Sequence, residues 1–198
     1  MSGDIKTFTK LIPGTVATVR TLRAVQASVL RTIYRDRFHE VVLTKVWRRN
    51  IWGDSESRSG PGSNLNETRF LRGALSRLLM ELGVCKLLDI PCGDFHRMKE
   101  VEILKGLVYL GGDIVQEMIR VNNDRCGGDT ISFEKLDILR DPLSEVDLVL
   151  RRDCLVHFST MDVFRAIGNL KRSGSKHVLL THYAGDRSNR KLSYAIPG

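Results

Sequence analysis

The chain has 198 residues, of which 42% are hydrophobic and 27% are charged, and only 17 are Gly and 5 are Pro. This composition excludes a disordered, collagen-like or fibrous chain and predicts a soluble globular protein with one core. The formal net charge is +8, but residues 1–50 hold ten Lys and Arg against three Asp and Glu, whereas residues 51–198 hold 21 against 20. Because a phosphate-tracking surface needs basic residues on the body of the protein, we do not expect a nucleic-acid partner.

The cysteines are scattered and contain no CxxC pair, which favours reduced thiols and a cytoplasmic location. They are Cys85, Cys92, Cys126 and Cys154. Cys154 and His157 form a C-x-x-H, yet no second ligand pair lies at zinc spacing, so we expect no metal site. The chain has no run of 18 apolar residues and no secretory signal, so we expect no transmembrane segment.

The N-terminal region predicts a basic amphipathic helix. Within residues 15–38, apolar residues recur at helical spacing, with Arg20, Arg23, Arg31 and Arg35 between them. Three interpretations stay open for this helix: packing on the body of the protein with the arginines in water, an organelle transit peptide, or a surface anchor. We therefore expect a basic helical extension over residues 1–50 and one domain over residues 51–198.

Residues 52–64 form the most Gly- and Ser-rich segment and predict a loop between these two parts. Asn64 with Glu67 three residues later forms a capping box, which predicts a helix that begins there and ends at Gly83. The residues expected on its buried stripe are Phe70, Leu71, Ala74, Leu75, Leu78 and Leu79.

Beyond Gly83, short apolar runs alternate with segments of helical length. The expected strands are residues 86–90, 107–110, 130–136, 146–150 and 177–181. The expected helices are residues 95–105, 114–124 and 159–171. Ser159 opens the last helix, with Asp162 at the capping-box position. This alternation predicts an α/β fold, a Rossmann-like three-layer sandwich whose mainly parallel sheet has about five strands.

In such a fold, ligands bind beyond the carboxyl ends of the strands, so the residues after each run are informative. Asp89 ends the first strand, and Gly93 lets the following turn approach a ligand closely. Asp113 ends the second strand 24 residues later, near the spacing at which an acid accepts hydrogen bonds from a ribose diol. Asp137 and Ile138 end the third, where a carboxylate would accept from the amine of a purine packed between apolar neighbours. Together the three acids predict one nucleoside site.

The residues of the turn after the first strand indicate which class of nucleotide ligand the site can bind. A dinucleotide fold needs G-x-G-x-x-G, but residues 91–95 supply one glycine and an additional acid, Asp94, which would repel a diphosphate. A P-loop lysine is missing as well. A cationic nucleoside without phosphates fits these acids, with its ammonium group near Asp89, and S-adenosylmethionine has this chemistry.

Residues 87–95 resemble motif I of the class I S-adenosylmethionine-dependent methyltransferases, with Asp113 and Asp137 in place of the ribose- and adenine-binding acids. A longer pattern resembles a small, largely uncharacterised, bacterial-type group of these enzymes. Its motifs are Trp52-Gly53, Ser59-Gly60-Pro61-Gly62-Ser63, residues 89–95, residues 151–157 and Arg172-Ser173-Gly174-Ser175. The resemblance implies that residues 59–63 form a lid over the cofactor. The cofactor contacts that it implies are Gly60, Gly62, Asp89, Pro91, Cys92, Gly93, Asp94, Asp113, Ile114, Asp137, Ile138 and Arg152.

The chain departs from this family in two ways. Pro91 and Phe95 stand where the commoner motif has glycines. The family's sheet has seven strands, whereas only residues 183–198 follow the fifth strand here, so we expect its C-terminal strand pair to be missing. That leaves an exposed sheet edge, which the N-terminal helix, a second copy of the chain or another partner would cover.

The residues after the fourth strand are the expected acceptor site. Asp153 or His157 would act as the base or position the acceptor, and His182 and Tyr183 could line the same pocket. We expect methyl transfer to an oxygen or nitrogen of a small-molecule or sugar-like acceptor. The alternative is a catalytically impaired binding or regulatory module that docks through its basic N-terminal helix. A nucleic-acid methyltransferase is disfavoured because no Asn-Pro-Pro-Tyr-like segment follows the fourth strand.

Overall fold

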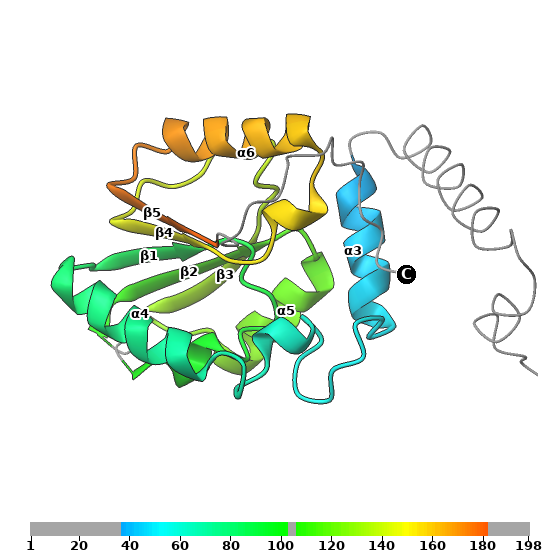
Figure 1. Ribbon diagram of the computed structural model, residues 1–198, viewed down its shortest axis with the longest axis horizontal. Coiled ribbons are helices and arrows are strands. Elements are labelled where there is room, and N and C mark those ends of the chain that lie inside the picture. The colour runs from blue at the N-terminus through cyan, green and yellow to red at the C-terminus, as the bar shows by residue number, and fades with distance from the viewer. Residues whose placement is uncertain (1–36, 103–105, 182–198) are drawn as a thin grey trace, which may run out of the picture. The chain divides into compact units, whose positions relative to one another are not determined.

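The computed structural model describes residues 37–102 and 106–181. The described residues form five strands and four α-helices, and two of the three helices predicted between strands are present (Figure 1). The helices are α3 (Phe38–Arg48), α4 (Arg69–Glu81), α5 (Gln116–Cys126) and α6 (Thr160–Arg172), with short 3-10 turns η2 (Pro61–Ser63), η3 (Met98–Glu100) and η5 (Leu155–His157). The strands are β1 (Lys86–Asp89), β2 (Val108–Asp113), β3 (Ile131–Lys135), β4 (Leu148–Arg151) and β5 (His177–Leu180).

The five strands form one sheet in the order β3-β2-β1-β4-β5, and every neighbouring pair is parallel. In Figure 1, α6 covers one face of the sheet, and α4 and α5 cover the other. The predicted α/β fold with a parallel sheet of five strands is therefore confirmed. The order reverses at β1, whose neighbours are β2 and β4, so the carboxyl ends of these three strands frame the crevice where this architecture binds ligands.

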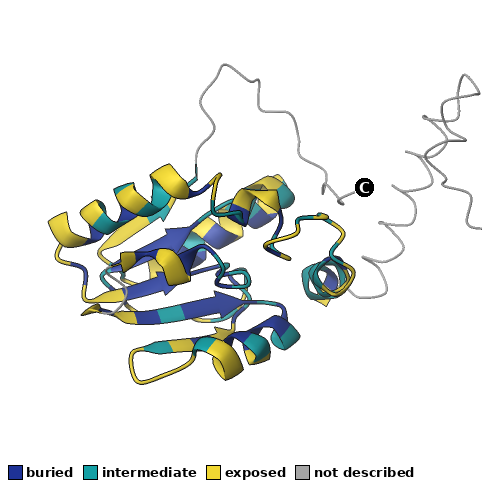
Figure 2. Ribbon diagram, turned by 90° about the horizontal axis from the view of Figure 1, so that it is seen from below, coloured by how far each residue is buried: buried dark blue, intermediate teal, exposed yellow. Residues whose placement is uncertain are grey.

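Each face of the sheet has its own hydrophobic core because successive side chains along a strand point to opposite faces. On one face Leu87 and Leu148 pack with Leu79 of α4 and Ile119 of α5. On the other, Leu88 and Val149 pack with Ala166 and Leu170 of α6. In Figure 2 the buried residues concentrate in the central strands, while the outer sides of the helices are exposed. The ends of β1 and β4 thus rest on two rigid cores.

The helix expected over residues 95–105 is wrong as far as the structure describes this segment. Between Phe95 and residue 102 the structure has only the 3-10 turn η3. Phe95 has a positive φ of 60°, outside the helical range, and is buried with its ring 5.0 Å from the rings of Tyr109 and Phe133. The aromatic packing of Phe95 therefore takes precedence over the helical pattern of the sequence.

The capping box at Asn64 is also wrong. Helix α4 begins at Arg69, after Thr68, and the Asn64 side chain instead accepts from the Asn66 backbone N–H at 2.8 Å. Asn64 therefore forms a turn before the helix, as asparagine side chains commonly do. Of the predicted buried stripe, Leu75 and Leu79 are buried, but Phe70 in the first turn is 81% exposed.

The other helix boundaries lie close to those expected. The Ser159 side chain accepts from the Asp162 backbone N–H and donates to the Asp162 carboxylate, so the predicted cap of α6 is confirmed. Helix α5 begins at Gln116, two residues later than expected. Helix α4 ends one residue before Leu82, and Gly83 follows with a φ of 59°, as a C-terminal glycine should.

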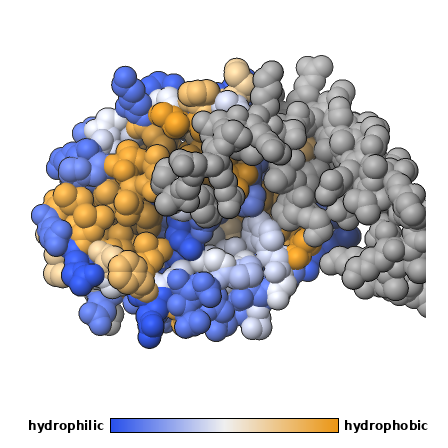
Figure 3. All heavy atoms as spheres, viewed as in Figure 1, coloured by the Kyte–Doolittle hydropathy of each residue, from blue (hydrophilic) through white to orange (hydrophobic). Residues whose placement is uncertain are grey.

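Strand β5 is an edge of the described sheet, and most of its side chains are exposed, including Val178 and Leu180. Figure 3 shows apolar side chains gathered over the sheet on the face viewed there. The edge that was expected after the fifth strand is thus present within the described residues. Whether a second copy or another partner covers it stays a prediction.

The chain divides into two compact units, Met1–Val41 and Val42–Gly198, and the boundary falls inside α3. Most of the predicted basic helix over residues 15–38 lies outside the described residues, as do His182 and Tyr183. In the larger unit, Arg48 at the end of α3 forms an ion pair with Glu117 of α5. The predicted domain boundary after residue 50 stays a prediction. No helix among the described residues is long and apolar enough to span a membrane.

Candidate functional site

The parallel register brings the carboxyl ends of three strands to one edge of the sheet. This carboxyl edge is distinct from the lateral edge that β5 forms. Asp89, the last residue of β1, is paired with Gly111 of β2 and with Leu150 of β4. Asp113 ends β2 and Arg151 ends β4. The first two predicted acids, and the loop that follows β4, are therefore brought to this edge by neighbouring strands.

The loop after β1 is held in place by Asp113. Gly93 has a φ of 61° and donates its backbone N–H to the Asp113 carboxylate at 3.2 Å, while its carbonyl accepts from the Asn122 side chain at 2.8 Å. A Cβ at this position would lie 2.5 Å from the Ser59 hydroxyl oxygen. Position 93 therefore requires glycine both for its backbone conformation and for space.

Asp113 is buried at 5% exposure, and its hydrogen-bond donors among the described residues are backbone N–H groups rather than a cationic side chain. Its two oxygens accept backbone N–H groups from Gly93, at 3.2 Å, and from Val115, at 3.0 Å. Burial raises the pKa of this carboxyl to about 6, the backbone hydrogen bonds oppose the rise, and nearby Asp89 adds to it. The backbone donors from Gly93, Val115 and Ile114 do not fill all of its acceptor sites, so the carboxylate can accept a hydroxyl donor as well.

Asp89 is fully buried, and its charge is met inside the protein. Both of its oxygens lie 3.3 Å from the Arg97 guanidinium, and the Tyr109 hydroxyl donates to it at 3.0 Å. Burial raises the pKa of Asp89, whereas Arg97 and Tyr109 lower it. Sequence reasoning missed Arg97, because His96, Lys99 and Glu100 stand beside it and no pattern singles it out. Contact between Asp89 and a cofactor ammonium stays a prediction.

The segment predicted as a lid lies against the motif loop through Asp94. The Asp94 carboxylate accepts from the Ser57 hydroxyl at 2.9 and 3.0 Å and from the Arg58 backbone N–H at 2.9 Å. In return, the Asp94 backbone N–H donates to the Ser59 hydroxyl at 2.9 Å. The additional acid that distinguishes this loop from a diphosphate site therefore ties residues 57–59 to it.

The far end of the same segment contacts the loop after β4. The Arg152 guanidinium donates to the Gly62 carbonyl at 2.5 Å and forms an ion pair with Asp153 at 3.0 Å. A Cβ at Gly62 would lie 3.3 Å from an Asp153 carboxylate oxygen, and one at Gly60, whose φ is 94°, would lie 3.2 Å from Trp52. Both glycines therefore permit close approach within this segment.

The two predicted catalytic residues lie in different environments. Asp153 has a φ of 50°, pairs with Arg152, and donates its backbone N–H to the Thr181 hydroxyl at 3.1 Å. His157 lies in η5 with its ring stacked on Trp52, the centroids 6.1 Å apart. Burial lowers the pKa of His157, and Asp153 opposes this. His157 is therefore neutral at pH 7 and able to accept a proton.

The third predicted acid is occupied by local contacts. Asp137 accepts from the Arg140 guanidinium at 2.7 Å and from the Leu139 backbone N–H at 2.9 Å. Ile138 is buried in the core beneath α6. The structure thus places Asp137 and Ile138 just beyond β3 as a stabilised turn, and their contact with an adenine ring stays a prediction.

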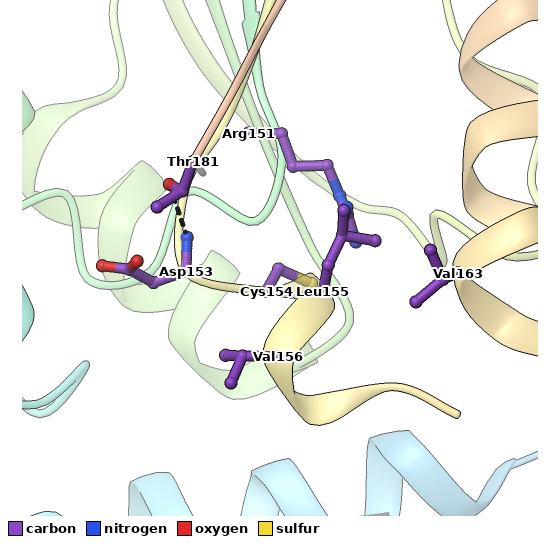
Figure 4. A pocket seen from close by; sticks show the side chains of 7 residues that line it. All are labelled: Arg151, Asp153, Cys154, Leu155, Val156, Val163 and Thr181. Carbon is purple, nitrogen blue, oxygen red and sulfur yellow. Dashed lines mark hydrogen bonds between the residues drawn. The ribbon is translucent and has the colours of Figure 1, made fainter. Parts of the chain in front are cut away.

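A pocket of about 180 Å³ opens beside the ends of β4 and β5. It is lined by Arg151, Asp153, Cys154, Leu155, Val156, Val163 and Thr181 (Figure 4). Sequence reasoning placed the acceptor after β4 but did not single out Arg151. Among the described residues, no three His, Cys, Asp or Glu side chains are grouped as metal ligands would be.

Two solved structures share this fold. The methyltransferase domain of bacterial CtHen1-CN matches with a TM-score of 0.51 and 17% identity, over 59% of this chain and 65% of that one. Magnesium protoporphyrin IX methyltransferase from Synechocystis PCC 6803, crystallised with bound SAH, matches with a TM-score of 0.50 and 20% identity, over 76% of this chain and 70% of that one. No family model and no curated protein sequence matches the chain. The chain has the class I methyltransferase fold.

Proposed function

We propose that this protein binds S-adenosylmethionine and transfers its methyl group to an oxygen or nitrogen of a small-molecule acceptor. The observation that carries the proposal is that the end of β2, the loop after β1 and the segment over residues 59–63 contact one another at the carboxyl edge of the sheet. Asp113 holds the Gly93 backbone, and Ser59 lies directly against Gly93. A buried carboxylate, a close-approaching backbone and a covering segment are what a nucleoside with a charged tail requires.

The residues present fit such a cofactor. Asp113 keeps acceptor capacity for a ribose diol. Because burial raises its pKa, hydroxyl donors would stabilise its ionised form. Gly93 and residues 59–63 would enclose the methionine moiety, with Cys92, Asp94 and Ile114 as further lining. Because Asp89 is paired with Arg97, the acids that favour a cationic ligand over a diphosphate are Asp94 and Asp113. When bound, S-adenosylmethionine supplies a methyl group made electrophilic by its sulfonium centre.

The two residues proposed for catalysis take different roles in this proposal. His157 is neutral at pH 7, so it can accept the acceptor's proton. Asp153 is already engaged with Arg152, which in turn donates to the Gly62 carbonyl. Asp153 is therefore a positioning residue that steadies the covering segment, and His157 is the proposed base.

A second candidate function is a cofactor-binding module without turnover. The exposed edge at β5 supports it, because a sheet edge is a ready surface for a partner. The two candidates share the cofactor site and differ in turnover. Formation of SAH from S-adenosylmethionine with small hydroxyl- or amine-bearing acceptors, lost in His157→Gln, would favour the enzyme.

Calorimetric titration with S-adenosylmethionine and SAH tests the shared claim. The wild type should bind both ligands, and Asp113→Ala should weaken SAH binding by at least tenfold. The matched control is Asp124→Ala, which replaces an exposed acid of α5, the helix that follows β2. This variant should bind like the wild type. Absence of binding by the wild type would remove the proposal. Equal binding by Asp113→Ala would leave the cofactor and refute the assigned site.

A further inference from the structure

Arg151 is a buried cation, and no anion lies beside it in residues 37–102 and 106–181. It is the last residue of β4, is 2% exposed, and lines the pocket beside β4 and β5. None of its three guanidinium nitrogens has a hydrogen-bond acceptor in the part of the chain that the structure describes. In Figure 4 its side chain runs from the strand toward Leu155.

The groups around Arg151 do not neutralise it. The Cys154 thiol interacts with the guanidinium, but burial raises the pKa of this thiol to about 11, so it is uncharged at pH 7. The Phe158 ring centroid lies 5.5 Å from the guanidinium carbon, so the ring attracts the cation but brings no negative charge to it. Asp153, the acid among the pocket residues, is paired with Arg152 at 3.0 Å.

An uncompensated buried charge is unfavourable, and arginine keeps its proton rather than becoming neutral. Buried donors without partners are few in native proteins, and each one calls for an explanation. The two cores on either face of the sheet hold Leu148, Val149 and Leu150, so they fix the backbone that carries Arg151. A ligand that brings an anion to the guanidinium would supply the missing partner.

We propose that this pocket binds the carboxylate of a small organic molecule, with Arg151 as its charged partner. The planar fork of a guanidinium matches a carboxylate, and one cation balances one negative charge. Leu155, Val156 and Val163 form apolar walls for the carbon skeleton next to that group. The ligand class is therefore a small carboxylic acid with an apolar portion.

The pocket adjoins the segment that we propose covers the cofactor. Asp153 lines the pocket and also lies against Gly62, which accepts a hydrogen bond from Arg152. Resting on the proposed function, the inference deepens it: the carboxylate belongs to the methyl acceptor, and Arg151 holds that acceptor next to Asp153 and His157. Arg151 is then a specificity-determining residue for anionic acceptors.

The test uses benzoate and benzamide, which have the same shape but differ in charge, with the full chain in a low-chloride buffer at pH 7.5. Binding is followed by NMR chemical-shift titration. The wild type should bind benzoate at least tenfold more tightly than benzamide, and Arg151→Met should abolish this preference. Arg77→Met, an exposed arginine of α4, should leave it unchanged. Equal affinities in the wild type, or a preference kept by Arg151→Met, would overturn the proposal.

A second variant keeps Arg151 in place. Leu155→Glu puts a carboxylate beside the guanidinium, so it should weaken benzoate binding at least tenfold and raise the Tm, whereas Leu155→Gln should change benzoate affinity less than threefold. Benzoate binding unaffected by Leu155→Glu would contradict the assignment, as would a wild type that binds inorganic phosphate but not benzoate.

SAH titration of the same variants separates the carboxylate pocket from the proposed cofactor function. Benzoate binding without SAH binding would refute only the proposed function, and SAH binding without benzoate binding would refute only this pocket.

Discussion

Two buried arginines near the carboxyl ends of the strands lie in contrasting environments. Arg97, in the region of β1 and β2, lies 3.3 Å from both oxygens of Asp89, which also accepts from Tyr109. Arg151, at the end of β4, has an uncharged thiol and an aromatic ring beside it. The first cation is neutralised by the protein itself, whereas the second has no anion beside it among the residues that the structure describes. The difference separates a residue that supports the site from one that we propose contacts the acceptor.

The largest expected effect is on stability, and it should differ between the two arginines. Arg97→Met leaves the buried Asp89 carboxylate without its cation, which should lower the free energy of unfolding by about 3–5 kcal/mol. Arg151→Met removes an uncompensated charge and keeps the contact with Phe158, so it should change that quantity by no more than about 1 kcal/mol, toward greater stability. Denaturant unfolding measures both. An equal loss in the two variants would show that Arg151 is structural.

The second prediction concerns the other acid of the β1 and β2 region. Asp113 has backbone donors where Asp89 has a cation, and burial raises its pKa to about 6. Hydroxyl donors from a ribose favour the ionised carboxylate, so SAH affinity should rise up to about tenfold per pH unit between pH 5 and 6 and level off above that. Calorimetry across this range checks it. Asp113→Asn should flatten the dependence, and an unchanged slope in that variant would assign it to another group.

The third prediction compares two glycines with nearly the same backbone conformation. Gly93 and Gly83 have φ values of 61° and 59°, so alanine at either position should cost about 1–2 kcal/mol of unfolding free energy. A Cβ at Gly83 meets nothing within 4 Å, whereas one at Gly93 meets the Ser59 hydroxyl at 2.5 Å. Only Gly93→Ala should therefore also weaken SAH binding, by about tenfold. Loss of binding in both variants would argue against a local effect.

The smallest effect is expected for the link between the covering segment and the loop after β4. Arg152→Met removes the hydrogen bond to the Gly62 carbonyl and the ion pair with Asp153. Because these contacts are partly exposed, SAH affinity should fall only about fivefold, or about 1 kcal/mol, with little change in unfolding free energy. Titration of this variant beside Arg77→Met checks it. A stronger effect on unfolding than on binding would make Arg152 a structural residue.

The sequence predicts the architecture well because hydrophobic periodicity reflects burial. The apolar runs that become β1 and β4, and the Ser159 cap of α6, follow from local patterns alone. The turn after β1 does not, because the conformation of Phe95 depends on Tyr109 and Phe133, which lie far from it in the sequence. A helical pattern over residues 95–105 contains no sign of that contact.

The candidate site is predictable in part for the same reason. Strand ends locate Asp89 and Asp113, since parallel strands bring their carboxyl ends together. The sequence does not tell which charges are already paired: Asp89 is met by Arg97, and Asp137 by Arg140. Nor does it tell that Arg151 lines a pocket whose acid, Asp153, is already paired with Arg152. Pairing is a property of three-dimensional packing.

The most direct test of the account is a crystal structure of the full chain grown with SAH. The account predicts density for SAH at the ends of β1 and β2, with its ribose hydroxyls within hydrogen-bond distance of the Asp113 carboxylate and its methionine moiety between Gly93 and residues 59–63. SAH bound elsewhere, or bound without contact to Asp113, would contradict it.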